Sequence, residues 1–390
     1  MSVCSADSYS RMLYAKQILS ADQPCDRRPG NAPADAGVTY SDDGSVHLCV
    51  YAPHASAVTA DVSVSGTNRQ TAVLEKGSDG AFRTVFAYQK NFNGPANTLL
   101  RIDGNESLDP FIPIIWTNNR PYNCIEFPSE DMDWIFPRKV PHGTITVHTF
   151  DSEVMGRAER VLVYTPAGMQ NKELPVLYLL NGSTDNETSW FSVGRIADIF
   201  DNLLADGKMM PFIAVTVNAM LRENGAVNND RDGALERMLC SEVIPLIEGE
   251  HLRTKKNRAV AGLSMGAYMT ADIAMHRPDL FAYAGTFTAS LSQTPEQIAS
   301  MYTRSGYVRP YHTFLQEVTA EQFASMYRVW FRSTTTQEDH PELFEADDRL
   351  FEQAGYSALP CSYRILYPAE VTKWNSWRCG IRDYAQLLFR

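Results

Sequence analysis

The fold is decided by one stretch of the chain, Ala261-Gly262-Leu263-Ser264-Met265-Gly266. Its last five residues read Gly-x-Ser-x-Gly, with apolar Val260 and Ala261 at the front and a helix-forming run, 267–275, behind. This order predicts a strand that ends in a sharp turn and leads into a helix. Small flanking residues let the serine adopt a strained backbone conformation with its oxygen exposed. The stretch therefore predicts that Ser264 is a nucleophile.

Strand and helix patterns alternate on both sides of that turn. Unbroken apolar runs at 175–180 and 212–217 are typical of strands buried on both faces. Further strands are predicted at 160–164 and 258–261, and helices at 196–205 and 237–248. Such alternation indicates an α/β domain with a mostly parallel sheet, which we assign to residues 139–390.

The chain before residue 139 has a different character. Residues 1–36 are predicted to be a lead-in and linker, because 25–36 are rich in Pro, Gly, Asp and Arg. Between 37 and 138, short strand-like segments are separated by turn residues, which predicts a small all-β sandwich. These segments are 46–51, 57–64, 82–88 and 98–102. Alternation of apolar and other residues, which is typical of strands in a sandwich, is clearest in 57–64, where every second residue from Val58 is apolar.

Composition excludes some classes of partner. The 390 residues carry a net charge of −11, which argues against nucleic acid and anionic membranes as partners. Because no stretch of about 18 apolar residues occurs, we expect no membrane span. The first 25 residues lack an apolar core of signal-peptide length, so we expect a cytoplasmic location. A homo-oligomer is left open.

The seven cysteines are scattered and form no Cys-x-x-Cys pair. This pattern predicts neither a zinc site nor a disulfide framework. We therefore expect no metal and no cofactor.

Several stretches resemble one family. The chain is similar to the esterase family of α/β-hydrolases that includes esterase D, feruloyl and acetyl-xylan esterases, enterochelin esterase and mycolyltransferases. The matching stretches are 140–144 with 160–166, 174–182 with Trp190, the turn at 262–266, 276–281, and 374–389. The resemblance implies an α/β-hydrolase fold for residues 139–390. Residues 51–55, 102–104 and 108–110 resemble the immunoglobulin-like early-set module that precedes many carbohydrate-active domains.

The resemblance also implies an activity and a site. The expected activity is that of a serine carboxylic-ester hydrolase that acts on a small-molecule or oligosaccharide ester, such as a feruloyl or acetyl ester of xylan. Ser264 would attack the ester carbonyl. The N–H of Met265 and that of Gly182 or Ser183 would form the oxyanion hole. Asp339, with Glu338 as the neighbouring alternative, falls where the family carries the acid of its catalytic triad.

Aromatic residues near these stretches are candidates for substrate binding. Trp190, Tyr268 and Trp374 could line an aryl or sugar cleft, as could Trp377, which is paired with Trp374 in sequence. The alternative interpretation is that they fill the core, which is the more common role of buried aromatic side chains.

Two positions depart from the family pattern. Asn181 stands where family members usually carry a histidine before the oxyanion glycine, and that loop must supply only a backbone N–H. Thr372 stands where the family carries its catalytic histidine. A threonine hydroxyl cannot accept the serine proton near neutral pH. Among the eight histidines, His312 and His340 are the candidates for a replacement base, and His340 adjoins the candidate acid.

Three functional hypotheses follow from these residues. The first is an esterase that acts on esterified carbohydrate. The second is a catalytically inactive relative that binds a carbohydrate or a protein. The third is an intracellular siderophore hydrolase similar to enterochelin esterase.

Overall fold

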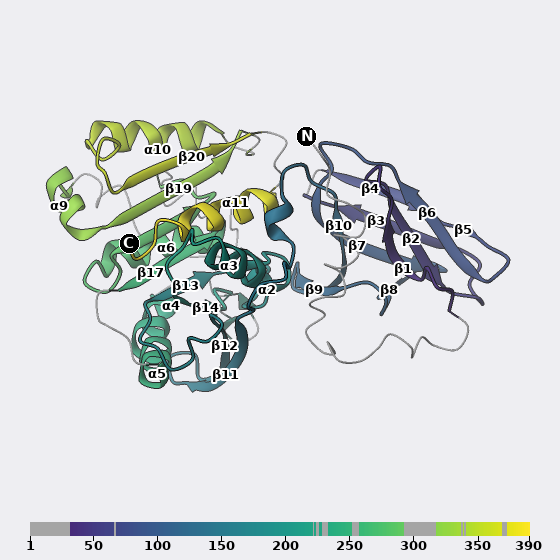
Figure 1. Ribbon diagram of the computed structural model, residues 1–390, viewed down its shortest axis with the longest axis horizontal. Helices are drawn as coiled ribbons and strands as arrows, with labels where there is room; N and C mark the ends of the chain where they lie inside the picture. Colours follow the sequence, from purple (N-terminus) through teal and green to yellow (C-terminus); the bar gives the residue numbers. More distant parts are fainter. Residues whose placement is uncertain are drawn as a thin grey trace. The chain divides into compact units, whose positions relative to one another are not determined.

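The chain divides into two units in the computed structural model, and Figure 1 labels their elements. One unit comprises Met1–Lys139 with Glu370–Asn375, and the other comprises Val140–Ala369 with Ser376–Arg390. The structure describes residues 32–65, 68–220, 222–223, 226–227, 233–251, 257–291, 317–336, 338, 341–368 and 373–390.

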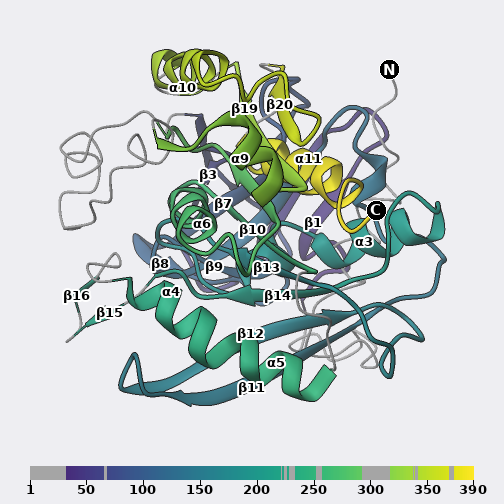
Figure 2. The same cartoon turned by 90° about the vertical axis from the view of Figure 1, so that its left-hand side faces the viewer.

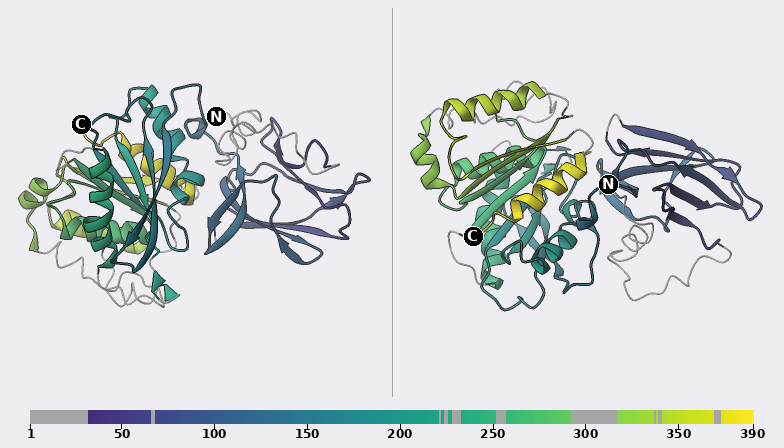
Figure 3. Two further views of the ribbon diagram at one scale, coloured as in Figure 1. Left: turned by 90° about the horizontal axis from the view of Figure 1, so that it is seen from below. Right: turned by 45° about the horizontal axis from the view of Figure 1, so that its top comes forward.

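Every strand pair described in the first unit is antiparallel, and its strands form two sheets (Figure 3). The first sheet has the order β1 (Gly37–Tyr40), β2 (Val46–Tyr51), β6 (Ala81–Phe86), β5 (Glu75–Lys76). The second has the order β4 (Arg69–Val73), β3 (Val58–Ser63), β7 (Gly94–Ile102), β10 (Arg120–Phe127), β9 (Ile114–Thr117), with β8 (Asn105–Ser107) on β7. A short 3₁₀ helix, η1 (Asp133–Ile135), follows.

Alternating polarity explains how these sheets bury one face. In β3, Val58, Ala60 and Val62 are fully buried, whereas the residues between them are half-buried. The two sheets meet at an edge-to-face contact between Phe86 of β6 and Phe127 of β10, with ring centroids 5.6 Å apart. Strands lie at all four predicted segments of this region, with shifted ends at 57–64, 82–88 and 98–102.

Residues 373–375 begin the last helix but group with the first unit. The Asn375 side-chain amide is buried and donates hydrogen bonds to Asn93 Oδ1 and Ser129 Oγ, both at 2.8 Å. A side-chain Cβ at Gly94 would lie 2.8 Å from the same Asn375 nitrogen, so the backbone of Gly94 packs directly on Asn375.

The second unit is built on an eight-stranded sheet. Its order is β11 (Thr144–Ser152), β12 (Arg157–Thr165), β14 (Ile213–Val217), β13 (Val176–Leu180), β17 (Arg258–Leu263), β18 (Tyr283–Phe287), β19 (Val329–Thr335), β20 (Ser362–Tyr367). The strands from β14 to β20 are parallel, and β11 and β12 pair antiparallel. The predicted mostly parallel sheet is thus confirmed. A separate two-stranded pair joins β15 (Arg222–Glu223) to β16 (Ala226–Val227).

Helices cover both faces of this sheet (Figure 2). They are α2 (Ser189–Ser192), α3 (Ile196–Ala205), α4 (Ala234–Met238), a π-helical turn η2 (Leu239–Val243), α5 (Ile244–His251), α6 (Met265–His276), α9 (Ala320–Met326), α10 (Pro341–Gln353) and α11 (Lys373–Ala385). One large core cluster joins α4, α5, α6, α9 and α10 to one sheet face. On the other face, α3 packs through Phe200 on Tyr164, and α11 packs through Tyr384 on Phe287.

The central strands agree with their sequence patterns. All five residues of β13 and all five of β14 are buried, as the unbroken apolar runs predict. The helix predicted at 196–205 has those bounds, and the one predicted at 237–248 is a continuous helical stretch from α4 through η2 to α5. Within the described residues, no helix is both long and apolar enough to cross a membrane.

Candidate active site

Ser264 occupies the sharp turn between β17 and α6. Its backbone has φ 50° and ψ −121°, a positive-φ conformation that is uncommon for any residue with a side chain. The two glycines of the motif make that turn sterically feasible. A Cβ on Gly262 would lie 2.4 Å from Gly266 O, and a Cβ on Gly266 would lie 2.4 Å from Asn181 O. The structure therefore contains the strained strand–turn–helix that the Gly-x-Ser-x-Gly pattern predicts.

Backbone hydrogen bonds hold this turn from both sides. Ser264 N donates to Phe287 O at the end of β18, at 2.9 Å. Ser264 O accepts from Ala267 N at 2.9 Å and from Tyr268 N at 3.3 Å, which begins α6. Ser264 is half-buried, whereas both of its chain neighbours are buried. The strained conformation is thus fixed by the adjacent strand and by the helix.

The loop after β13 lies beside the serine. A Cβ on Gly182 would lie 2.5 Å from Leu263 Cδ1 and 3.5 Å from Ser264 Cβ. Parallel pairing explains this proximity, because Leu180 at the end of β13 is in register with Gly262 of β17. Parallel strands present their carboxyl ends at one edge of the sheet, where ligand sites of such sheets gather.

The Asn181 side chain fixes the orientation of that loop. Asn181 is fully buried; its Nδ2 donates to Gly182 O at 2.8 Å, and its Oδ1 accepts from Ala219 N at 2.8 Å. The carbonyl and N–H of a trans peptide point in opposite directions. With Gly182 O held by the amide, the Ser183 N–H points away from Asn181. Sequence reasoning treated Asn181 as a tolerated loss of a side chain and missed this bridging role.

Met265 begins α6, and its backbone N–H is in the first turn of that helix. First-turn N–H groups have no acceptor within their own helix, and the helix dipole adds partial positive charge there. An oxyanion next to Ser264 would therefore meet main-chain donors without any side-chain rearrangement.

The predicted aromatic lining residues lie in packed positions. Trp190 is 0% exposed, and its Nε1 donates to Leu180 O at 3.0 Å, so its indole supports the end of β13 from inside the core. Tyr268 is buried in α6, and its hydroxyl accepts from Ser290 N at 3.4 Å. Trp374 is half-buried and groups with the first unit. For Trp190 and Tyr268, this burial favours the core-filling interpretation.

A second residue with positive φ, Thr288, lies near the serine turn. Thr288 directly follows Phe287, and its backbone has φ 61°. Its Oγ1 donates to Glu338 Oε1 at 3.1 Å and accepts from Trp377 Nε1 at 3.1 Å. The same Glu338 oxygen also accepts from Thr335 N at 3.2 Å. Thr288 thus joins the segment after β19 to helix α11, one residue from the strand end that binds the serine backbone.

Neither Thr288 nor its junction was predicted from sequence. The sequence indicates Thr288 only as a polar residue after a buried strand, and such residues are common at this edge of a parallel sheet. Trp377 was considered only as a lining residue, but it is buried and its indole N–H binds Thr288.

The predicted acid, the predicted base and Thr372 lie outside the described residues, as does His312. Within the described part of the chain, no histidine has a recorded hydrogen bond to Ser264. Instead, His47 lies beside Ser41, His142 beside Asp201, His148 beside Thr146, and His276 beside Asp272 and Glu236.

Three of the described cysteines are poor alternative nucleophiles. Burial raises the pKa of the Cys49 thiol to about 11, that of Cys240 to about 11 and that of Cys379 to about 12. These thiols are protonated near neutral pH, and the thiolate is the reactive form.

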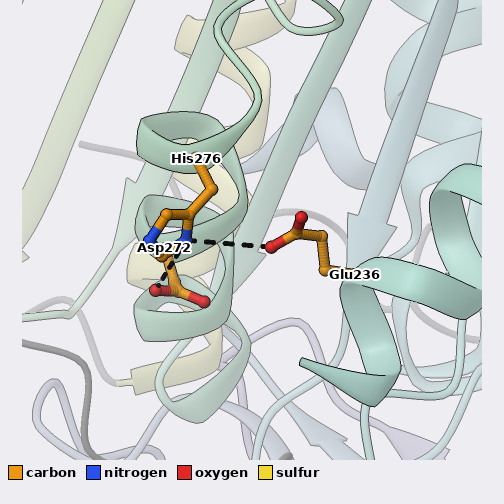
Figure 4. Close-up of side chains that lie close together, drawn as sticks. All are labelled: Glu236, Asp272 and His276. Atoms are coloured by element: carbon orange, nitrogen blue, oxygen red, sulfur yellow. Dashed lines mark ion pairs between the residues drawn. The ribbon is translucent and has the colours of Figure 1, made fainter. Parts of the chain in front are cut away.

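One group of side chains could hold a metal ion. Glu236, Asp272 and His276 bring one ligand atom each to within 4.8 Å of one another (Figure 4). The group lies at the opposite end of α6 from Ser264 and was not predicted.

Comparison with known proteins gives consistent results. The family model described as "Putative esterase" matches residues 152–379. A curated relative, an endo-1,4-beta-xylanase/feruloyl esterase from Xylanibacter ruminicola, is 33% identical over 286 residues, which cover 69% of this chain and 38% of the relative. The chain thus spans well under half the length of that relative.

Two solved structures share the fold. A CE1 ferulic acid esterase from Anaeromyces mucronatus, in complex with ferulic acid, gives a TM-score of 0.55 at 21% identity over 66% of this chain and 95% of its own. The enterochelin esterase from Shigella flexneri gives 0.58 at 14% identity over 89% of this chain and 94% of its own. Since the family model matches more than half of the 390 residues, the protein belongs to this esterase family, and its second unit has the α/β-hydrolase fold.

Proposed function

We propose that the protein is a serine carboxylic-ester hydrolase that cleaves feruloyl or acetyl esters of plant carbohydrate through a Ser264 acyl-enzyme. The observation that carries this proposal is the Ser264 turn, a strained nucleophile position flanked by the Gly182 loop and the start of α6. The feruloyl part of the substrate class is taken from the name of the Xylanibacter ruminicola relative, and the acetyl part from the family resemblance.

The proposed reaction uses main-chain donors for the developing charge. Ser264 Oγ attacks the ester carbonyl, and its proton passes to a base. The N–H groups of Met265 and of Ser183 or Gly182 stabilise the oxyanion, a contribution worth about 2.7–4 kcal/mol per donor in comparable enzymes. The alcohol leaves with a proton from the protonated base, and water then releases the acid from the acyl-enzyme.

We propose His340 as the base and Asp339 as the carboxylate that orients it. The support is the Thr288 junction. Ser264 N binds Phe287 O, Thr288 is the next residue, and Thr288 binds Glu338. His340 follows the anchored Glu338 by two residues in sequence, and two residues of chain span at most about 7 Å. Glu338, the alternative acid, already accepts hydrogen bonds from Thr288 and Thr335 and is proposed as the anchor of this segment.

A second candidate function is non-catalytic binding of a carbohydrate or a protein partner. What favours it is Thr372, at the position where the family resemblance implies a catalytic histidine. A third candidate, siderophore ester hydrolysis, rests on the fold shared with enterochelin esterase over 89% of the chain.

For the first unit, we propose that residues 37–138 form an immunoglobulin-like early-set module after a lead-in of residues 1–36. Its two antiparallel sheets support this assignment.

We propose a packing role for the module, a cytoplasmic location for the protein, and Trp374 as a substrate contact. We leave open whether it self-associates.

The functional test is hydrolysis of three esters by purified protein: methyl ferulate, p-nitrophenyl acetate and enterochelin. The proposal predicts turnover of the first two that is lost in Ser264→Ala, with a His148→Ala variant as a surface-histidine control. Turnover of enterochelin alone would favour the siderophore hydrolase. Rates equal to buffer for all three esters, with retained binding of feruloylated xylan oligosaccharides, would favour the non-catalytic candidate.

A further inference from the structure

The second unit carries a group of metal-ligand side chains that plays no part in the proposed acyl chemistry. Asp272 and His276 are one helical turn apart on α6, and Glu236 reaches them from α4 (Figure 4). His276 Nδ1 lies 3.2 Å from Asp272 Oδ1 and 3.7 Å from Glu236 Oε2. One imidazole nitrogen thus faces two carboxylates from two different helices.

We propose that Glu236, Asp272 and His276 bind one divalent transition-metal ion, with Zn²⁺ as the reference ion. An imidazole nitrogen and carboxylate oxygens are ordinary ligands of such ions. Ligand atoms about 2.0–2.2 Å from a tetrahedral ion lie about 3.3–3.6 Å from one another. The two distances measured from His276 Nδ1 bracket that spacing, so an ion would require only small side-chain movements.

Charge and burial favour a cation at this point. The Asp272 side chain is only 2% exposed, and a buried carboxylate needs a compensating positive charge. Two carboxyl side chains converge on one imidazole nitrogen, and this set of ligands suits a divalent cation.

The site also has a path to solvent. The His276 side chain is 42% exposed and that of Glu236 is 18% exposed, so an ion can enter without local unfolding. Water can complete the coordination shell on this open side.

The position argues for a structural role. Asp272 and His276 are in the last two turns of the helix Met265–His276, so the site lies about 12–18 Å along the helix from the Ser264 end. An ion here cannot touch an ester bound at Ser264. It would instead clamp the carboxyl end of α6 to α4, the helix that begins the 234–251 segment.

The test is Zn²⁺ binding to chelator-treated full-length protein by isothermal titration calorimetry, with thermal unfolding measured in parallel. We expect one saturable equivalent and a rise in Tm at saturating Zn²⁺, because a ligand of the native state stabilises it. Glu236→Gln and His276→Gln should each weaken binding at least about tenfold and remove the rise in Tm. Both side chains reach solvent, so these variants should still fold.

Matched control variants distinguish Zn²⁺ binding at this site from Zn²⁺ binding to a cysteine or to another histidine. Cys240→Ser and His148→Ala should bind Zn²⁺ with unchanged affinity. Absence of saturable binding to the wild-type protein would overturn the proposal, as would equal binding by His276→Gln. Since the readouts are affinity and Tm, the result does not depend on whether Ser264 hydrolyses esters.

Discussion

The two halves of the proposed catalytic site differ in how they are specified. At the ends of β13 and β17, the serine, its glycines and the loop beside it keep the full geometry of a nucleophile turn. At the carboxyl ends of β18 and β19, the Thr288 side chain binds Glu338 and Trp377, and the proposed acid and base follow Glu338 in sequence. Apart from the Ser264 hydroxyl, the first half consists of backbone groups, whereas the second consists of side chains.

This difference has a physical reason. The oxyanion donors and the strained serine follow from sheet register and from steric contacts that the fold cannot lose without unfolding. A catalytic histidine contributes little to packing, so its replacement leaves the fold intact. The geometry of the turn therefore reports on the fold, whereas the proton-transfer residues decide the activity.

The largest expected effect is that of Gly266→Val, which tests whether the backbone half is fixed by packing. The new Cβ would lie 2.4 Å from Asn181 O and 2.8 Å from Leu180 O, both backbone atoms of the β13 end. We expect a loss of about 3–5 kcal/mol in the free energy of unfolding, measured by urea denaturation. Gly249→Ala is the control, because nothing lies within 4 Å of its Cβ, and it should be neutral or stabilising. Equal stability of Gly266→Val and wild type would contradict the steric account.

The second effect concerns the side-chain half. With His340 as the proposed base, His340→Ala should lower kcat for methyl ferulate about 10²–10⁴-fold, the usual contribution of a positioned base. Thr372→His, which places a histidine where the family resemblance implies one, should change kcat little. The double variant with Ser264→Ala should stay inactive. A large rise in kcat for Thr372→His, with His340→Ala equal to wild type, would contradict His340 as the base.

The third effect separates the junction from the chemistry. Thr288→Val keeps the shape and β-branching of the side chain but removes its bonds to Glu338 and Trp377. A lost hydrogen bond with a partly buried partner left unsatisfied costs about 1–3 kcal/mol. If Thr288 positions the segment that carries the base, kcat should fall by about tenfold or more while KM changes little. A change in Tm with unaltered kcat would limit Thr288 to a structural role.

The smallest effect is expected in the first unit, far in sequence from either half. Burial raises the pKa of Asp109 above its ordinary value, although Phe111 N–H donates to its carboxylate. Between the ordinary and the raised pKa, the folded state binds more protons than the unfolded state, so this group makes stability fall as pH rises through that window. Asp109→Asn should therefore gain Tm relative to wild type at pH 7 and lose that gain near pH 3. A difference in Tm that does not vary with pH would refute this.

The sequence was most informative where structure is local. The turn at Ser264 and the buried strand 175–180 each depend on a few consecutive residues, so the sequence pattern predicts the observed backbone there. Thr288 could not be found this way, because its junction joins residues 288, 338 and 377, which only the strand order brings together. The same holds for Asn181, whose amide binds Ala219 across two strands, and for the Glu236 group.

The central claim is that the Ser264 hydroxyl is a reactive nucleophile held beside an oxyanion hole. The most direct measurement is covalent labelling of the wild-type protein with a fluorophosphonate, followed by peptide mass spectrometry. We predict a single labelled residue, Ser264, and no labelling after Ser264→Ala or after heat denaturation. A wild-type protein that stays unlabelled over hours at millimolar reagent would contradict the account.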